Sequence, residues 1–157
     1  MDLKFWKGLL LVIASLLTTR FTHAGNAATL DLAADANFQA FLAAYISAVN
    51  SRNIAKLAEL AHPKCLVVVT PQNKDFYDYW FTKETRRNIP PDCKLTVTVI
   101  PADGALPFEN IVSYPIRPTH QIQLDFDYAP NKSVSVIRQL VHEGDKWYEV
   151  IPAKKAP

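Results

Sequence analysis

One stretch of strict apolar–polar alternation, and a second stretch that repeats its pattern, constrain the fold of this chain more than any other feature of its sequence. Apolar and polar residues alternate over residues 119–128, and the pattern repeats over residues 133–143. A period of two is typical of a strand with one buried and one solvated face. Residues 129–132, Ala-Pro-Asn-Lys, have the composition of a turn, so the sequence predicts an antiparallel hairpin. The rest of the chain must then cover its apolar face.

The register of this hairpin decides which polar side chains meet. A five-residue connection over residues 129–133 predicts that His120 lies opposite His142 and that Leu124 lies opposite Arg138. A shift by two residues would keep the same faces but separate the two histidines. In either register Arg138, His120 and His142 lie on the apolar face.

A buried guanidinium needs partners, so Arg138 is the first candidate site residue. An acid from the helices, such as Asp78 or Glu84, is one alternative, and the anionic group of a ligand is the other. His120 and His142 could act as acid and base near neutral pH, or lie at the rim of the site without a catalytic role. Because two histidines lack a third ligand, we predict no metal site. No cofactor is expected either.

The opposite face of the hairpin carries polar residues, with Ile137 and Val141 as its apolar positions. This mixture suits solvent or a polar homodimer interface. Asp125 and Asp127 form a pair of carboxylates on this face, and we interpret them as solubility residues.

The first half of the chain shows helical spacing. Asp31 or Asp35 is the expected N-cap of a helix that ends near Val49, and Asn53 is the expected cap of a second helix over residues 54–60. A short apolar strand is expected over residues 66–69.

A third helix is expected over residues 75–86. Phe76, Tyr79, Trp80 and Lys83 share one face in it, which we expect to pack on the sheet. Tyr79 and Trp80 are candidates for lining a ligand cavity, although a purely structural core role is the alternative. Further strands are expected over residues 95–99, 108–116 and 146–151.

This order of elements resembles the nuclear transport factor 2-like superfamily, which includes ketosteroid isomerases and polyketide cyclases. The resemblance rests on residues 41–49, the helix break and restart at 50–60, residues 62–69 and the closing residues 147–150. It implies an α+β fold, a curved, mostly antiparallel sheet packed on two to three N-terminal helices as a cone. The break often reads Gly-Asp in such proteins, whereas here it is Arg52-Asn53. The resemblance also implies a cavity between sheet and helices and frequent dimerisation, but no fixed function.

The N-terminus has the layout of a secretory signal peptide. Lys4 and Lys7 precede the apolar run 8–17, and a polar segment ends at Ala24. We expect cleavage after Ala24, with Ala27 as the second choice. An uncleaved anchor is the alternative, but the run is shorter than the roughly 20 residues of a spanning helix. Residues 25–157 are then expected to form one domain, secreted or periplasmic, with no further membrane contact.

Charge and cysteine content narrow the class of partner. The signal peptide carries three basic and one acidic residue, so its removal lowers the net charge of +2 to about zero. A neutral chain gives no reason to expect nucleic acid as a partner.

The chain has two cysteines, Cys65 and Cys93. An even number of cysteines in an exported chain favours a disulfide, with two buried thiols as the alternative.

These observations favour a small exported ligand-binding or accessory domain without strong catalytic machinery, which takes a small hydrophobic or anionic ligand. The first alternative is an isomerase, cyclase or dehydratase that acts on a small hydrophobic substrate. Such chemistry needs a carboxylate base and a proton-donating group in an apolar cavity, and no residue is assigned to these roles from the sequence. The second alternative is an interaction subunit of an envelope assembly.

Overall fold

The computed structural model describes residues 32, 34–71 and 73–154. The elements run in the order α2 (Ala36–Asn50), α3 (Ile54–Leu60), α4 (Pro63–Leu66), α5 (Lys74–Glu84), β1 (Lys94–Val99), β2 (Val112–Ser113), β3 (His120–Ala129), β4 (Lys132–Glu143), β5 (Lys146–Glu149) and β6 (Ala153–Lys154). Strands β1, β3, β4 and β5 form one antiparallel sheet in that order, while β2 pairs with β6 apart from it.

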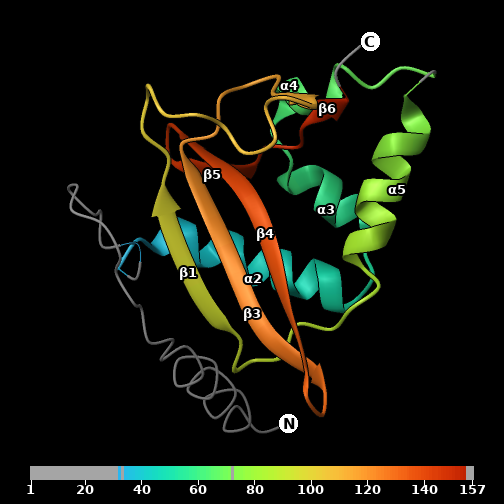
Figure 1. The fold of residues 1–157 in the computed structure, drawn as a ribbon, viewed down its shortest axis with the longest axis vertical. Coiled ribbons are helices and arrows are strands. Elements are labelled where there is room, and N and C mark those ends of the chain that lie inside the picture. Colours follow the sequence, from blue (N-terminus) through green and yellow to red (C-terminus); the bar gives the residue numbers. More distant parts are fainter. Residues whose placement is uncertain (1–31, 33, 72, 155–157) are drawn as a thin grey trace, which may run out of the picture.

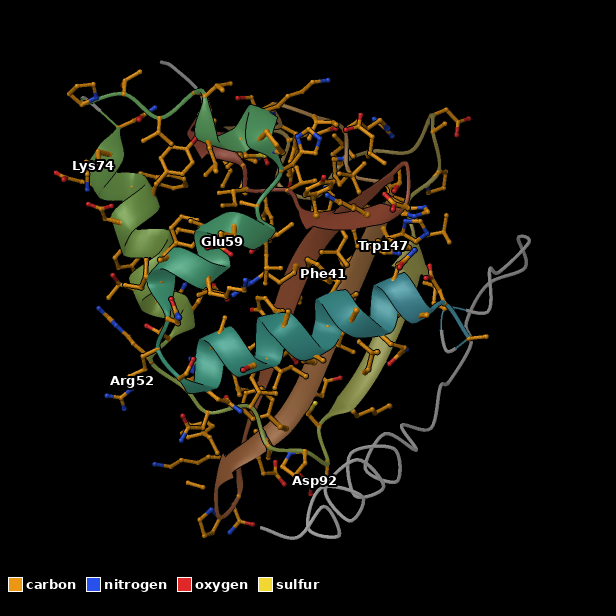
Figure 2. All side chains as sticks on the ribbon, turned by 180° about the vertical axis from the view of Figure 1, so that it is seen from behind. Phe41, Arg52, Glu59, Lys74, Asp92 and Trp147 are labelled. Atoms are coloured by element: carbon orange, nitrogen blue, oxygen red, sulfur yellow. The ribbon has the colours of Figure 1, made fainter. Side chains whose placement is uncertain are left out.

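The helices cover one face of this sheet. In Figure 1 the strands lie in front of α2, and in Figure 2, seen from behind, α2 crosses in front of them. The apolar face of α2 meets the inward-facing side chains of the sheet, which include Leu95, Ile122, Leu124 and Leu140. The α+β class with N-terminal helices on an open antiparallel sheet is therefore confirmed. The sheet does not close into a barrel.

Helix α2 begins at Asp35, one of the two predicted caps. One carboxylate oxygen of Asp35 accepts the N–H groups of Asn37 (2.8 Å) and Phe38 (3.0 Å). The other oxygen accepts the indole N–H of Trp147 at 3.0 Å, which ties β5 to the start of the helix. Burial of the Asp35 carboxylate opposes these hydrogen bonds, but together they hold its pKa below the usual value.

The end of α2 explains the unusual helix break. The N–H groups of Arg52 and Asn53 donate to the carbonyls of Val49 (3.0 Å) and Ala48 (2.9 Å), which is a Schellman motif. Arg52 occupies its left-handed position with a φ of 57°. Glycine is the usual residue there, because a Cβ makes this conformation unfavourable.

The strand expected over residues 66–69 is wrong. His62 caps a short helix, α4, by accepting the N–H of Lys64 on Nδ1 at 3.1 Å, and Pro63 is preorganised for the first helical position. The other ring nitrogen of His62 lies 3.0 Å from Glu143 Oε2. Val67 follows the helix and is exposed. An apolar run this short does not distinguish a strand from a helix end.

The expected packing face of the third helix is only partly confirmed. Phe76 and Trp80 pack against the core, but Tyr79 is 54% exposed. Helix α5 buries Tyr77 and Phe81, which lie outside the expected face. Trp80 is half-buried. Five aromatic residues in six positions give no clear apolar stripe, so their spacing did not determine which face packs on the sheet.

The hairpin forms, but two residues out of the predicted register. Ile122 lies opposite Arg138, and His120 lies opposite Leu140. The ladder continues to Ala129 and Lys132 across a two-residue connection, in which Asn131 adopts a left-handed φ of 60°. An irregularity in the pairing at residue 128 takes up the difference. The inward and outward faces are unchanged, as a shift by two requires.

The strand expected over residues 108–116 is reduced to the two residues of β2. Tyr114 donates its hydroxyl to the carbonyl of Pro107 (2.6 Å), and Arg117 donates to the carbonyls of Pro101 (2.8 Å) and Gly104 (2.6 Å). Proline-rich flanks and these side-chain bonds hold the segment as a loop. The first and last predicted strands are present as β1 and β5.

The predicted disulfide is absent from the described residues, where Cys65 and Cys93 are free buried thiols. Cys65 lies in α4, and Cys93 immediately precedes β1. Figure 1 shows α4 at the top of the molecule, whereas β1 begins at the lower end of the sheet, where Figure 2 labels the neighbouring Asp92. A disulfide needs Cα atoms within about 7 Å, which sequence spacing alone does not reveal.

Residues 1–31 lie outside the described part of the chain, and with them the predicted signal peptide and Asp31. Among the described residues, no helix has the length and apolar character needed to cross a bilayer.

We predict that Arg52→Gly stabilises the protein by about 0.5–1 kcal/mol, because it relieves the left-handed strain at the Schellman position and loses part of this gain to chain entropy. The measurement is equilibrium unfolding in urea. Arg87→Gly is the matched control, since Arg87 is exposed and its φ is not positive. A destabilised Arg52→Gly variant would contradict the prediction.

Candidate functional site: a buried carboxylate cluster

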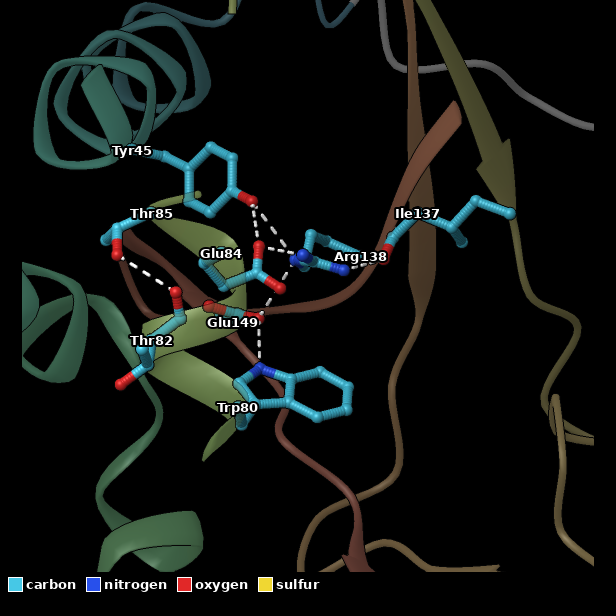
Figure 3. Close-up of polar contacts among 8 residues, drawn as sticks. All are labelled: Tyr45, Trp80, Thr82, Glu84, Thr85, Ile137, Arg138 and Glu149. Atoms are coloured by element: carbon cyan, nitrogen blue, oxygen red, sulfur yellow. Dashed lines mark hydrogen bonds and ion pairs between the residues drawn. The ribbon is translucent and has the colours of Figure 1, made fainter. Parts of the chain in front are cut away.

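Arg138 lies at the centre of a buried polar cluster that joins two helices and two strands (Figure 3). Its guanidinium contacts Glu84 on α5 through one terminal nitrogen, while Nε donates to the hydroxyl of Tyr45 at 3.0 Å and lies 3.5 Å from Glu149 Oε1. The Tyr45 hydroxyl donates to Glu84 at 2.6 Å. The remaining terminal nitrogen donates to the carbonyl of Ile137. Each guanidinium nitrogen therefore has a partner within the protein.

The side chains of this cluster are almost fully removed from solvent. Arg138 is 13% exposed, Glu84 6% and Glu149 1%. The Trp80 ring lies against the guanidinium, 5.5 Å from ring centre to Arg138 Cζ, and its indole N–H donates to Glu149 Oε1 at 3.3 Å. Buried charges require such pairing, because an uncompensated charge in a protein interior is strongly destabilising.

Helical spacing brings the α5 side chains to this cluster. Tyr77, Trp80 and Glu84 follow one another at i, i+3 and i+7 and therefore lie on one face of the helix. On the strand side, Arg138 comes from β4 and Glu149 is the last residue of β5.

The electrostatics of the cluster depend on its charge balance. It holds one guanidinium and two carboxyl groups. Burial raises the pKa of Glu149, against the opposing effects of Arg138 and of the Trp80 hydrogen bond. Burial also raises the pKa of Tyr45 to about 12. The Glu149 carboxyl therefore holds its proton more strongly than an exposed glutamate does.

Three buried side-chain atoms have no hydrogen-bond partner among the described residues, and besides Gln139 Oε1 two of them belong to α5 and β5. These two are Glu149 Oε2 and the Tyr77 hydroxyl, and both are buried. Trp80 lies between them in the fold: Tyr77 comes one turn before Trp80 on the same face of α5, and the Trp80 indole N–H donates to Glu149 Oε1 at 3.3 Å. The amide N–H of His62 donates to the carbonyl of Glu149 at 2.8 Å, which places the start of α4 beside β5. Buried polar atoms without partners are rare in native proteins.

The predicted site residues divide between different parts of the fold. Arg138 and Trp80 meet in the cluster. The contact of Arg138 with Glu84 is one of the two alternatives that the sequence left open. Tyr79 is exposed and does not belong to the cluster. Its ring centre lies 5.9 Å from the guanidinium of Arg86.

The two histidines meet at Trp147 instead of at each other. His120 is buried, with its ring centre 4.8 Å from that of Trp147 in an edge-on contact, and exposed His142 stacks on Trp147 at 4.7 Å. Burial lowers the pKa of His120, and the nearby His142 lowers it further. No three His, Cys, Asp or Glu side chains gather within the described ranges in a way that could hold a metal ion.

Sequence reasoning missed Glu149, Tyr45 and Tyr77 as members of the site. The alternation of β5 could have revealed Glu149, because Trp147, Glu149 and Ile151 are all buried on the same face. A charged residue at an inward-facing strand position indicates a buried polar site, and Glu149 meets this criterion in the same way as Arg138 does. Tyr45 and Tyr77 reach the site through the packing of α2 and α5 on the sheet, which no local sequence pattern indicated.

The structure thus defines the class of protein as α+β, with N-terminal helices on an open four-stranded antiparallel sheet and a buried ion cluster between them. Comparisons with protein-family models, with curated proteins and with solved structures find no match for this chain.

We predict that Arg138→Met destabilises the protein by about 3–5 kcal/mol, because it leaves two buried carboxyl groups without their cation. Glu84→Gln added to Arg138→Met is expected to recover a large part of this loss, since the remaining Glu149 can stay protonated. Urea unfolding of the parent, both single variants and the double variant gives the coupling. Asp78→Asn, which removes an exposed ion pair with Lys74, is the control and costs less than about 1 kcal/mol. Additive single effects would contradict the network.

We predict opposite outcomes for two Tyr→Phe substitutions. Tyr45→Phe costs about 1.5–3 kcal/mol, because it removes hydrogen bonds to Arg138 and Glu84. Tyr77→Phe is neutral or stabilising by up to about 1 kcal/mol, because it removes a buried hydroxyl that has no partner among the described residues. Thermal and urea unfolding provide the measurement, and a large loss in Tyr77→Phe would show that its hydroxyl has a structural partner.

We predict that stability falls as the pH rises through the folded-state pKa of Glu149. A folded-state pKa above the usual 4.5 means that the folded protein holds this proton more tightly, so the contribution is complete below pH 4.5 and is lost above the folded value. The ionisable groups that act on Glu149 are Arg138, Tyr45 and Cys65, and Glu84 shares the Arg138 guanidinium with it.

The test is the free energy of unfolding from pH 4.5 to about 8, compared with that of Glu149→Gln. The amide does not titrate, so the difference between the two curves isolates Glu149. Parallel curves would show that Glu149 has an ordinary pKa in the folded state.

Proposed function

We propose that this chain is an exported small-molecule-binding domain of the nuclear transport factor 2-like type, and that its ligand lies between α5 and the sheet, against Glu149 and Tyr77. The observation that carries the proposal is the pair of buried oxygen atoms without partners among the described residues, Glu149 Oε2 and the Tyr77 hydroxyl. In a structural core such atoms only reduce stability, whereas in a binding site they give a ligand its orientation.

The surroundings of these atoms support a ligand that is partly apolar. Trp80 is half-buried beside Glu149, and the ring of Phe76 lies 6.1 Å from that of Trp80 and 5.3 Å from that of Tyr77. Ligand sites commonly combine such aromatic surface with a few fixed polar groups. Arg138 serves the site indirectly, because it holds Glu149 and Glu84 in place.

The expected contact between Arg138 and an anionic ligand loses its support. The guanidinium nitrogens already contact Glu84, Tyr45, Glu149 and the carbonyl of Ile137. An anion would also have to approach two carboxyl groups. The role of Arg138 in this proposal is therefore to position the binding groups.

Proton transfer by Glu149 is a second candidate function, as in an isomerase, cyclase or dehydratase. Its raised pKa favours this candidate, because buried carboxyl groups with perturbed pKa values are common at catalytic sites.

Export and self-association are part of the proposal. The charged, apolar and polar order of residues 1–24 supports export. On the outer face of the sheet, Ile137 is 40% exposed and supports a homodimer interface. Val141, the other apolar position of this face, is buried and adds less.

The test is a thermal-shift screen of the purified protein against small carboxylates, amines, sterol-like compounds and polyketide-like compounds. A ligand at a hundredfold excess over its Kd stabilises the folded state by about 2.7 kcal/mol, which raises the Tm by several degrees. We expect Trp80→Leu to abolish the shift and Ile137→Ser, on the outer face, to retain it. The absence of a shift with every compound, or a shift that Trp80→Leu retains, would overturn the proposed site.

A further inference from the structure

The charge balance of the buried cluster points to the chemical class of the ligand. Arg138 contributes one positive charge, and Glu84 and Glu149 contribute two carboxyl groups, and all three side chains are almost fully removed from solvent. Two ionised carboxylates would leave one negative charge without compensation in the interior. Such a charge is avoided either by a proton or by a bound cation.

The geometry assigns the uncompensated carboxyl to Glu149. Glu84 contacts the guanidinium directly and also accepts the Tyr45 hydroxyl at 2.6 Å. Glu149 interacts more weakly with the Arg138 guanidinium, because only its Oε1 lies near Nε, at 3.5 Å. The same oxygen also accepts a hydrogen bond from the Trp80 N–H at 3.3 Å. Its Oε2 contacts no donor among the described residues.

A second buried oxygen supports a ligand at this position. The Tyr77 hydroxyl is 3% exposed and has no partner in the described part of the chain. It belongs to the same face of α5 as Trp80 and Glu84, one turn before Trp80. A carboxylate oxygen and a phenol oxygen beside aromatic rings are groups that hold an ammonium ion.

We propose that this site binds a small organic cation, an alkylammonium or arylalkylammonium group, which donates hydrogen bonds to Glu149 Oε2 and to the Tyr77 hydroxyl. This inference rests on the proposed function, since it specifies the ligand of the same site. In the free protein a proton on Glu149 balances the charge. When the ammonium binds, the O–H bond of the Glu149 carboxyl breaks, the proton goes to solvent and the carboxylate pairs with the cation.

Three probes of matched shape test the charge of the ligand: benzylammonium, benzyl alcohol and benzoate. We expect benzylammonium to bind at least about tenfold more tightly than benzyl alcohol, because hydrogen bonds to a charged group are stronger than those to a neutral one. Benzoate is expected to show no binding. Calorimetry at pH 7 provides the affinities.

Two further readouts separate charge pairing from simple burial. Benzylammonium affinity should rise by up to about tenfold per pH unit below the folded-state pKa of Glu149, and buffers of different ionisation enthalpy should reveal proton release on binding. The other ionisable groups around Glu149 are Arg138, Tyr45 and Cys65, together with Glu84, which shares the Arg138 guanidinium; Tyr77 lies one turn before Trp80 on α5.

Glu149→Gln should remove the preference for benzylammonium over benzyl alcohol together with the proton release. Tyr77→Phe should weaken benzylammonium binding by about twofold to tenfold. Tyr79→Phe is the matched control, because Tyr79 lies on the exposed side of the same helix, and it should bind as the parent does. If Glu149→Gln does not fold, the pH dependence and the proton release of the parent still decide the question.

The outcomes distinguish the two proposals. Equal or tighter binding of benzyl alcohol or benzoate, or binding without proton release, would overturn the cation inference and leave a binding site in place. If other compounds bind in the screen and benzylammonium does not, the cation inference is likewise overturned and the binding site is retained. If no compound in the screen or in this series binds, both proposals fail.

Discussion

The contact of one buried guanidinium with two carboxyl groups is the interaction on which the arrangement of this protein depends. Arg138 on β4 joins Glu84 on α5, Glu149 on β5 and, through its hydroxyl, Tyr45 on α2. Hydrophobic burial brings these elements together without fixing their directions, because it is not directional. The cluster adds the direction: each partner must reach the same guanidinium from its own element.

Strand β5 carries an unusual share of these connections for its four residues. Trp147 donates to Asp35 at the start of α2, and Tyr148 meets the ring of His62, the cap of α4, at 5.1 Å. Glu149 joins α5 and β4 through Trp80 and Arg138. The edge strand therefore links the helical layer to the sheet, and side chains on both of its faces take part.

The same interaction sets the chemistry that the site can offer. A buried cluster in which positive and negative charges balance needs no ligand, and replacing it with apolar residues of similar volume could even increase stability. Here the second carboxyl group makes the cluster depend on a proton or on a bound cation. Tyr77 adds a further buried group of this kind, so α5 contributes both the aromatic surface and the unpaired hydroxyl.

The sequence by itself determined the class of fold, the hairpin with its two faces, the cap at Asn53, and the presence of Arg138 on the inner face, and it reduced the cap of α2 to Asp31 or Asp35. These features depend on residues close together in the chain, where period and capping chemistry act directly. Only the tertiary structure decided the hairpin register, the orientation of α5 and the distance between the two cysteines. Each of these depends on which distant side chains share one space, and Glu84, Tyr45 and Glu149 meet Arg138 across sequence separations that no local pattern encodes.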